Sequence, residues 1–241
     1  MRVKLVDWAS KGVDESATIP YQTETELRGA LARRVFDLGH RSIGRHGNVV
    51  FMVDGLSQDA LRQLSRHPHI NLTVKSSRYC DMSYATPFIP DWVRYMPNNS
   101  FMMEDFNDDY CTILDIYEKW QRIEELNNQK DTAKLFLPLC STTDVMISGN
   151  FQAMYEFLQL RLCERTQEEM RLLAKAMVQA IVCCEDMTVA NIVGNVGCKG
   201  SEYGICPESD KDCCGKYPTR SQCSVVPKLN LLLDKDVENG D

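Results

Sequence analysis

The chain has 241 residues, of which 44% are hydrophobic and 25% are charged, as is usual for a globular protein. Its formal net charge of −7 argues against a polymeric nucleic-acid partner, because such a partner requires a broad basic surface. No run of about 18 apolar residues is present, so we expect no transmembrane helix and no membrane partner. The N-terminal segment MRVKLVDWASKG lacks the apolar core of a signal peptide, and the expected location is therefore the cytoplasm.

The first third of the chain is predicted to mix strands and helices. Apolar and polar residues alternate at the N-terminus, apolar residues recur at helical spacing after Thr23, and Ser57 is placed to cap a helix. Gly39 is expected to end the first helix, and Gly55 the second strand. The predicted elements are a strand over residues 1–8, a helix over 23–38, a strand over 48–55, a helix over 57–66 and an extended segment over 71–78.

The rest of the chain is predicted to be mainly helical after a Pro- and Asn-rich loop that reaches about residue 107. Helices are predicted over residues 109–126, 130–137, 150–163 and 166–184. Strands and helices follow no regular βαβ order, so the predicted fold class is α+β.

We expect one domain over residues 1–225, with a Cys-rich segment from about 183 to 225 and an acidic tail over 226–241. Seven of the eleven cysteines lie between Cys183 and Cys223. A disulfide framework would suit a short secreted chain, so free thiols or a metal site fit this chain better. The spacing contains no C-x-x-C pairs, and we therefore assign no metal ligands.

The stretch from Ala60 to Cys80 contains no carboxylate, although the chain as a whole is acidic. It combines cations with hydroxyl donors, namely Arg62, Arg66, Lys75, Arg78, Ser76, Ser77 and Tyr79. Both kinds of group donate hydrogen bonds to anionic oxygens, so the stretch predicts a phosphate site. The alternative is a solvated surface that happens to lack acidic residues.

Two further segments carry polar groups that could bind a ligand. His40 and Ser42 follow the first predicted helix. Asn150 and Arg161 share one side of a later helix and are about 16 Å apart along its axis. The alternative for this helix is that Asn150 is a plain N-cap and that Arg161 is a surface cation paired with Glu156 or Glu164.

Taken in order, these segments resemble the flavin-dependent thymidylate synthase family from about residue 39 to 215. The family signature of Arg-His-Arg, seven residues and Ser-x-Arg-Tyr is similar to Arg66-His67-Pro68, seven residues and Ser76-Ser77-Arg78-Tyr79. Further matches are Gln63, Gly39-His40-x-Ser42, Ala133-Lys134-Leu135-Phe136-Leu137-Pro138, the run from Asn150 to Ala174, and the segment CPESDKDCCG.

The resemblance implies a central antiparallel sheet flanked by helices, in a homotetramer with active sites between subunits. It implies methylation of dUMP to dTMP, with methylenetetrahydrofolate as carbon donor and with FAD, reduced by NADPH, as hydride carrier. By position, the FAD contacts would be His40, Ser42, Arg66, His67 and Asn150. The dUMP contacts would be Gln63, Ser76, Ser77, Arg78, Lys134 and Arg161, with Arg78 and the serines near the phosphate.

Arg161 would also be the catalytic residue. C5 of uracil is a poor nucleophile, and a fixed guanidinium at the ring edge stabilises the negative charge that activates it. Four departures from the family pattern stand out: Pro68 replaces an Arg, Gln152 replaces an Arg, Lys134 replaces a substrate Arg, and Val74 replaces a Glu beside the nucleotide. They leave open a relative that acts on UMP or dCMP, a hydroxymethylase, or a catalytically inactive nucleotide-binding homologue.

Overall fold

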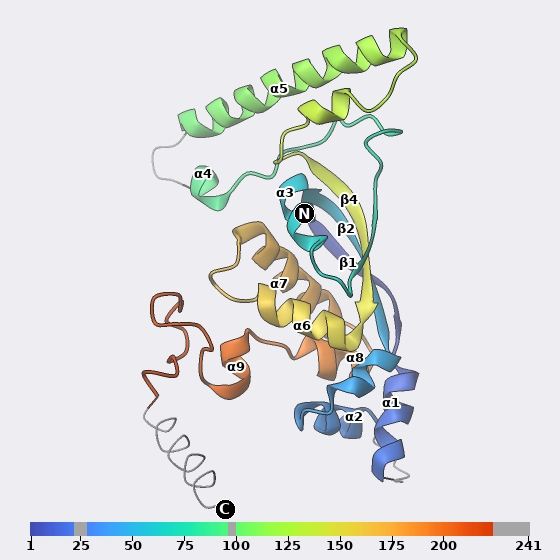
Figure 1. The fold of residues 1–241 in the computed structure, drawn as a ribbon, viewed down its shortest axis with the longest axis vertical. Helices are drawn as coiled ribbons and strands as arrows, with labels where there is room; N and C mark the ends of the chain where they lie inside the picture. Colours follow the sequence, from blue (N-terminus) through green and yellow to red (C-terminus); the bar gives the residue numbers. More distant parts are fainter. Residues whose placement is uncertain (22–27, 96–99, 224–241) are drawn as a thin grey trace, which may run out of the picture.

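A computed structural model describes residues 1–21, 28–95 and 100–223. Its centre is a four-stranded sheet in the order β1-β2-β4-β3, with every neighbouring pair antiparallel (Figure 1). The strands are β1 (Arg2–Ala9), β2 (Asn48–Ser57), β3 (Asn71–Val74) and β4 (Thr142–Asn150).

Side chains alternate between the two faces of this sheet, as the period of a strand requires. Val49, Phe51 and Val53 of β2 are fully buried on the face covered by helices, together with Ile147 of β4. That face packs against α6 (Phe151–Arg161) and α7 (Glu168–Val182), which lie side by side across the sheet (Figure 1). Met52 and Met146 form a cross-strand pair on the opposite face, where Met146 is exposed.

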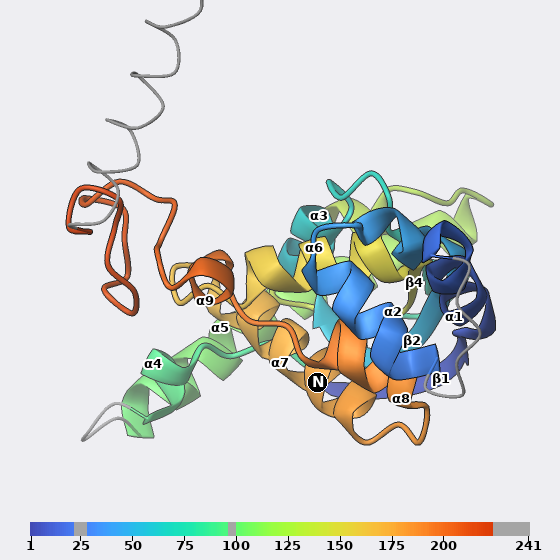
Figure 2. The same cartoon turned by 90° about the horizontal axis from the view of Figure 1, so that it is seen from below.

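Among the remaining helices, α1 and α2 lie at one end of the molecule and α4 and α5 at the other (Figure 1). Figure 2 shows α1 and α2 on one side and α4 on the other. These elements are α1 (Lys11–Thr18), η1 (Ile19–Tyr21), α2 (Arg28–Asp37), η2 (Arg41–His46), α3 (Gln58–Leu64), α4 (Asp91–Tyr95), α5 (Ser100–Leu126), η3 (Ala133–Phe136), α8 (Met187–Val189), a π-helical turn (Ala190–Gly194) and α9 (Lys199–Tyr203). In the described parts of the chain, no helix is both long and apolar enough to cross a bilayer.

The α+β class is confirmed, and so are β1 and the Ser57 cap. The helix predicted over residues 23–38 corresponds to α2, which ends at Asp37, close to the predicted end. The Ser57 side chain accepts a hydrogen bond from the Ala60 N–H at 3.1 Å. The proposed caps Thr23 and Thr25 lie outside the described residues.

Several predicted boundaries are wrong. β2 continues through Gly55 to Ser57, because Gly55 takes φ +82° at a register shift and does not end the strand. The extended segment after Asn71 ends at Val74, where pairing with β4 stops. The expected loop before residue 107 contains α4 and the first turns of α5, and residues 130–137 form only the short η3.

β4 was not predicted, although it is a central strand. Its sequence, TTDVMISGN, lies between two segments that read as helices, and its pairing partners are distant in the chain. Asn150 ends this strand and caps α6, which therefore begins one residue later than predicted.

Candidate functional site

Arg161, at the C-terminal end of α6, contacts His67, which follows α3. The Arg161 Nη2 atom lies 2.8 Å from His67 Nε2, and Arg161 Nε lies 3.2 Å from the same nitrogen. The His67 ring packs edge-on against Phe157, with 4.9 Å between the ring centroids. Phe157 lies one helical turn before Arg161, so one face of α6 holds both contacts. The pairing of Arg161 with a neighbouring glutamate is therefore wrong: Glu164 pairs with Arg171, and Glu156 accepts from Gln152.

The charge state of this pair follows from its partners. Burial lowers the pKa of His67, and the positive charge of Arg161 lowers it further. Burial also lowers the pKa of Arg161, with a smaller contribution from the neighbouring Arg66. A guanidinium can only donate, so His67 Nε2 accepts and the proton of the neutral ring resides on Nδ1. The structure thus brings Arg66, His67 and Arg161 together.

Gln63 is held by the start of α7. Its Nε2 atom donates to Gln167 Oε1 at 3.0 Å, and Gln167 Nε2 donates to Asp59 Oδ2 at 3.1 Å. This network joins α3 to the segment that precedes α7. Gln167 was not singled out as a site residue, although it is the Gln of the Ala-Gln-x-Glu pattern in the matched run.

A buried carboxylate also fixes the beginning of α3. Glu169 is fully buried and accepts from the backbone N–H of Ser57 at 2.7 Å and from the Ser57 hydroxyl. Burial raises the pKa of Glu169, against the opposing effect of the two Ser57 hydrogen bonds. Glu169 therefore sets the position of the helix that carries Gln63 and precedes Arg66 and His67.

The second group of predicted residues lies beyond the other end of β3, beside a cavity. Ser76 begins a turn, in which its carbonyl accepts from the Cys80 N–H at 2.9 Å. Ser77, Arg78 and Lys134 line a cavity of about 510 Å³ between this turn, α5 and η3. Arg78 Nε and Lys134 Nζ lie 2.7 Å and 2.5 Å from the same oxygen, Oδ1 of Asp131.

The third group lies at the N-terminal end of α6. His40 is the N-cap residue of η2, and both His40 and Ser42 are exposed. η2 packs closely against α6, since a Cβ atom on Gly44 would lie 3.0 Å from the backbone nitrogen of Gln152. Asn150 is the helix cap that the simpler interpretation expected, and its Oδ1 accepts from the Ala153 N–H at 2.9 Å.

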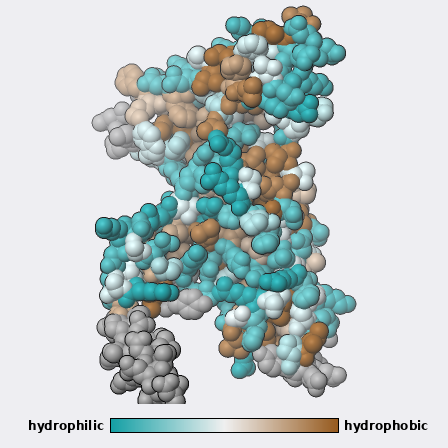
Figure 3. Space-filling view, viewed as in Figure 1, coloured by the Kyte–Doolittle hydropathy of each residue, from teal (hydrophilic) through white to brown (hydrophobic). Residues whose placement is uncertain are grey.

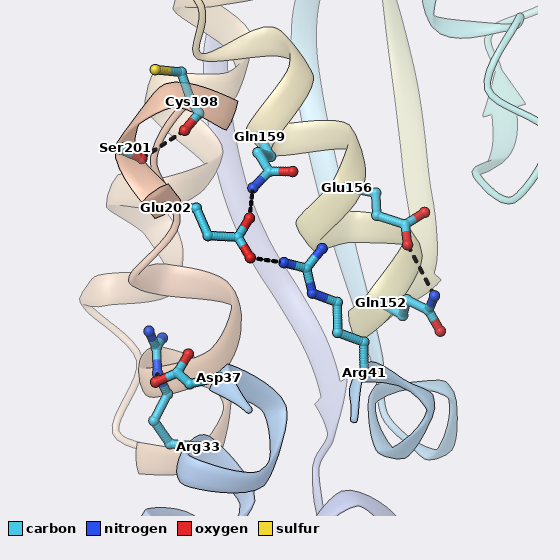
Figure 4. A network of polar contacts seen from close by, with 9 residues as sticks. All are labelled: Arg33, Asp37, Arg41, Gln152, Glu156, Gln159, Cys198, Ser201 and Glu202. Carbon is cyan, nitrogen blue, oxygen red and sulfur yellow. Dashed lines mark hydrogen bonds and ion pairs between the residues drawn. The ribbon is translucent and has the colours of Figure 1, made fainter. Parts of the chain in front are cut away.

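The Cys-rich segment reaches this third group through Glu202. Glu202 forms an ion pair with Arg41, and Gln159 Nε2 donates to its other oxygen at 2.5 Å (Figure 4). The Arg41 guanidinium lies over the Tyr155 ring, 4.9 Å from its centroid. No motif marked Glu202, because its partner is distant in the chain.

The cysteines form no disulfide, and all eleven are free thiols. Residues 1–21, 28–95 and 100–223 contain no group of three or more His, Cys, Asp or Glu side chains arranged to hold a metal ion. The Glu208 N–H lowers the pKa of the Cys206 thiol, but burial together with the neighbouring Cys213 and Cys214 outweighs this effect and raises the pKa.

The family model described as "Thymidylate synthase complementing protein" matches residues 3–183. The chain belongs to this family, that of the flavin-dependent thymidylate synthases. It is 28% identical over 203 residues to the flavin-dependent thymidylate synthase of Nitratidesulfovibrio vulgaris, covering 83% of this chain and 80% of that protein. It is also 28% identical to the enzyme of Thermococcus kodakarensis, over 87% of this chain and 90% of the relative.

Solved structures of this family share the fold. One flavin-dependent thymidylate synthase from Helicobacter pylori, complexed with FAD and dUMP, is 27% identical and has a TM-score of 0.59, covering 75% of this chain and 93% of the other. A second structure from the same organism, with FAD and dUMP, has a TM-score of 0.62 over 80% of this chain and 99% of the other, at 24% identity. In this flavin-dependent thymidylate synthase family member, the predicted site residues form three groups, which lie around α6 and β3.

Proposed function

We propose that this protein converts dUMP to dTMP, with methylenetetrahydrofolate as carbon donor, FAD as bound cofactor and NADPH as the source of reducing electrons. Family membership over residues 3–183 carries this proposal. The positive charge of Arg161, Arg78 and Lys134 supports it, because the resemblance assigns Arg161 to the pyrimidine ring and Arg78 to the phosphate of dUMP.

Arg161 would bind the uracil ring and stabilise the charge that develops on it. Its guanidinium is half-buried and is fixed by the neutral His67, which accepts a hydrogen bond without neutralising the positive charge. A desolvated, oriented cation stabilises developing negative charge more strongly than a solvated one does. Gln63, held by Gln167, lies one helical turn before Arg66 and His67 and would be a further ligand of the nucleotide.

The donor set also fits FAD. Arg66, His67, His40, Ser42 and Asn150 supply cations and polar groups suited to a phosphate-containing cofactor. When bound and reduced by NADPH, FAD would supply the hydride that reduces the transferred one-carbon group to the methyl group of dTMP.

Two departures bear on the fit of FAD. Gln152 stands where the family has an Arg, but its Oε1 accepts from Arg45 Nε at 2.8 Å, so a guanidinium is still present beside this position. Pro68, where the family has an Arg, is exposed and lies two residues after Arg66. We therefore assign the cofactor cations to Arg66 and Arg45.

The phosphate of dUMP would bind Arg78, Lys134, Ser76 and Ser77. Lys134 offers a point charge where the resemblance expects the two-pronged donor of an arginine. The guanidinium of Arg78 also lines the cavity and can donate two parallel hydrogen bonds, so Arg78 and Lys134 together can contact several phosphate oxygens.

We further propose a homotetramer with active sites between subunits. Arg66 and His67 precede β3, and Ser76 to Arg78 follow it, so the two groups lie at opposite ends of a strand about 13 Å long. A second copy of the chain would complete the pocket by bringing an Arg161 to the Arg78 end.

Exposed aromatic and aliphatic side chains support such an interface. Trp92 and Tyr95 of α4 and Phe101 of α5 are 61%, 71% and 73% exposed. Hydrophobic surface is visible over α5 at the top of the molecule (Figure 3). The proposed unit comprises one domain with its Cys-rich segment, and the proposed location is the cytoplasm.

An absorbance spectrum of the purified protein, recorded with and without dUMP and NADPH, tests the proposal. We expect a flavin spectrum at close to one FAD per chain, a shift on adding dUMP, and bleaching on adding NADPH. Labelled methylenetetrahydrofolate should then give labelled dTMP. Protein that stays colourless with excess FAD and shows no change with dUMP would contradict the proposal.

A further inference from the structure

One carboxylate oxygen occupies the position between the two proposed phosphate cations. Asp131 Oδ1 lies 2.7 Å from Arg78 Nε and 2.5 Å from Lys134 Nζ. Phosphate oxygens present the same chemistry to these donors, an anionic acceptor at hydrogen-bond distance. The three side chains are between one third and one half exposed, so a ligand can reach them from the cavity.

The backbone of Asp131 is held in an unusual conformation. Its φ is +97°, a region that L residues rarely adopt and that favours glycine. Glu124 fixes the following residues, because it accepts from the N–H groups of Thr132 and Ala133. The loop therefore maintains a strained aspartate at this position when a glycine would adopt the same backbone without strain.

The surrounding elements are rigid enough to hold this arrangement. Trp120 of α5 stacks on Phe136 of η3 with 5.5 Å between the ring centroids and 7° between the planes. Tyr117 of α5 is buried, and its hydroxyl accepts from the Met82 N–H at 3.2 Å. These contacts join the two walls of the cavity that carry Arg78 and Lys134.

The geometry points to Asp131 as a built-in competitor for the nucleotide phosphate and hence as a determinant of ligand specificity. This inference rests on the proposed function. Asp131 pairs with both Arg78 and Lys134 while the cavity holds no nucleotide. A dianionic phosphate is a stronger acceptor and displaces the carboxylate, whereas a nucleoside without a phosphate brings nothing that can do so.

The ionisation of Asp131 agrees with this role. The hydrogen bond from Lys134 lowers the pKa of Asp131, and the positive charge of Arg78 lowers it further. The carboxylate is therefore ionised at neutral pH and competes as an anion.

Asp131→Asn tests the inference through equilibrium binding, measured by calorimetry with dUMP and with deoxyuridine. We expect the variant to bind dUMP about 3- to 10-fold more tightly, because both cations are released from their ion pairs. Deoxyuridine binding should not change. Asp131→Gly is a second variant that removes the carboxylate and suits the backbone at φ +97°, and it should tighten dUMP binding to a similar degree.

Glu125→Gln is the matched control. Glu125 lines the same cavity, and among the described residues it forms no ion pair with Arg78 or Lys134. An equal gain in this control would mean a general charge effect and would overturn the inference.

Unchanged or weaker dUMP binding in both Asp131 variants would also overturn it, because Asp131 would then not compete with the phosphate. In that case wild-type protein still binds dUMP and the proposed function stands. If wild-type protein binds no dUMP, the proposed function fails and the inference fails with it.

Discussion

Glu202 of the Cys-rich segment forms an ion pair with Arg41, the residue between His40 and Ser42. Arg41 is further fixed by the Tyr155 ring, and Glu202 by Gln159 (Figure 4). A segment beyond the residues matched by the family model thus holds the turn that we propose contacts FAD.

Glu202→Ala should weaken FAD binding by about 3- to 10-fold, because Arg41 loses its ion-pair partner and the turn becomes less ordered. Flavin fluorescence quenching during titration with FAD measures the affinity, and a thermal melt of the same protein reports its stability. Asp37→Asn is the control, since Asp37 lines the same cavity but pairs with Arg33. Equal FAD affinity for wild type and Glu202→Ala would show that Glu202 is not a positioning residue.

Arg161→Ala should lower kcat by about 100-fold or more, the range seen when one donor to a developing anion is removed. Nucleotide binding should be partly retained, because Arg78 and Lys134 lie at the other end of β3. Steady-state turnover and dUMP binding, measured separately, check the two parts. Arg122→Ala, on the exposed face of α5, should have normal turnover, and normal turnover for Arg161→Ala would remove Arg161 from the mechanism.

The His67 pair should make stability depend on pH. The pKa of His67 in the folded protein lies below its ordinary value of 6.5. At a pH between the folded pKa and 6.5, the unfolded chain therefore binds more protons than the folded protein does. The free energy of unfolding should therefore rise with pH across that window and fall on acidification through it.

Urea unfolding at about pH 5.5 and about pH 7.5 measures this effect. His67→Gln keeps an acceptor for Arg161 without a titrating group, so the pH-dependent difference should shrink. His69→Gln, at an exposed position, should retain the wild-type difference. An unchanged difference in His67→Gln would contradict the assignment.

Ser57→Ala should destabilise the protein by about 2–4 kcal/mol, since it removes a helix cap and a hydrogen bond to the buried Glu169. Ser65→Ala, at an exposed hydroxyl on the C-terminal side of the same helix, should change stability by less than about 0.5 kcal/mol. Urea unfolding of both variants provides the comparison. A similar small effect for both would mean that Glu169 finds other partners.

The sequence alone determined the family and supplied the candidate site residues. Spacing within one element is local information, so the Ser57 cap and the α6 face with Phe157 and Arg161 could be predicted, whereas the turn at Ser76 was expected to be extended. The order of the motifs then identified the relatives.

Only the tertiary structure decided which of these residues meet. The Arg161–His67 contact, the Gln63–Gln167 contact and the Glu202–Arg41 ion pair join residues 94, 104 and 161 positions apart. Such pairings depend on how the sheet and helices pack, which no local spacing encodes. β4 carries a strand signal of its own, since the buried Thr143, Val145 and Ile147 alternate with more exposed residues, but its place between β2 and β3 depends on partners that are distant in the chain.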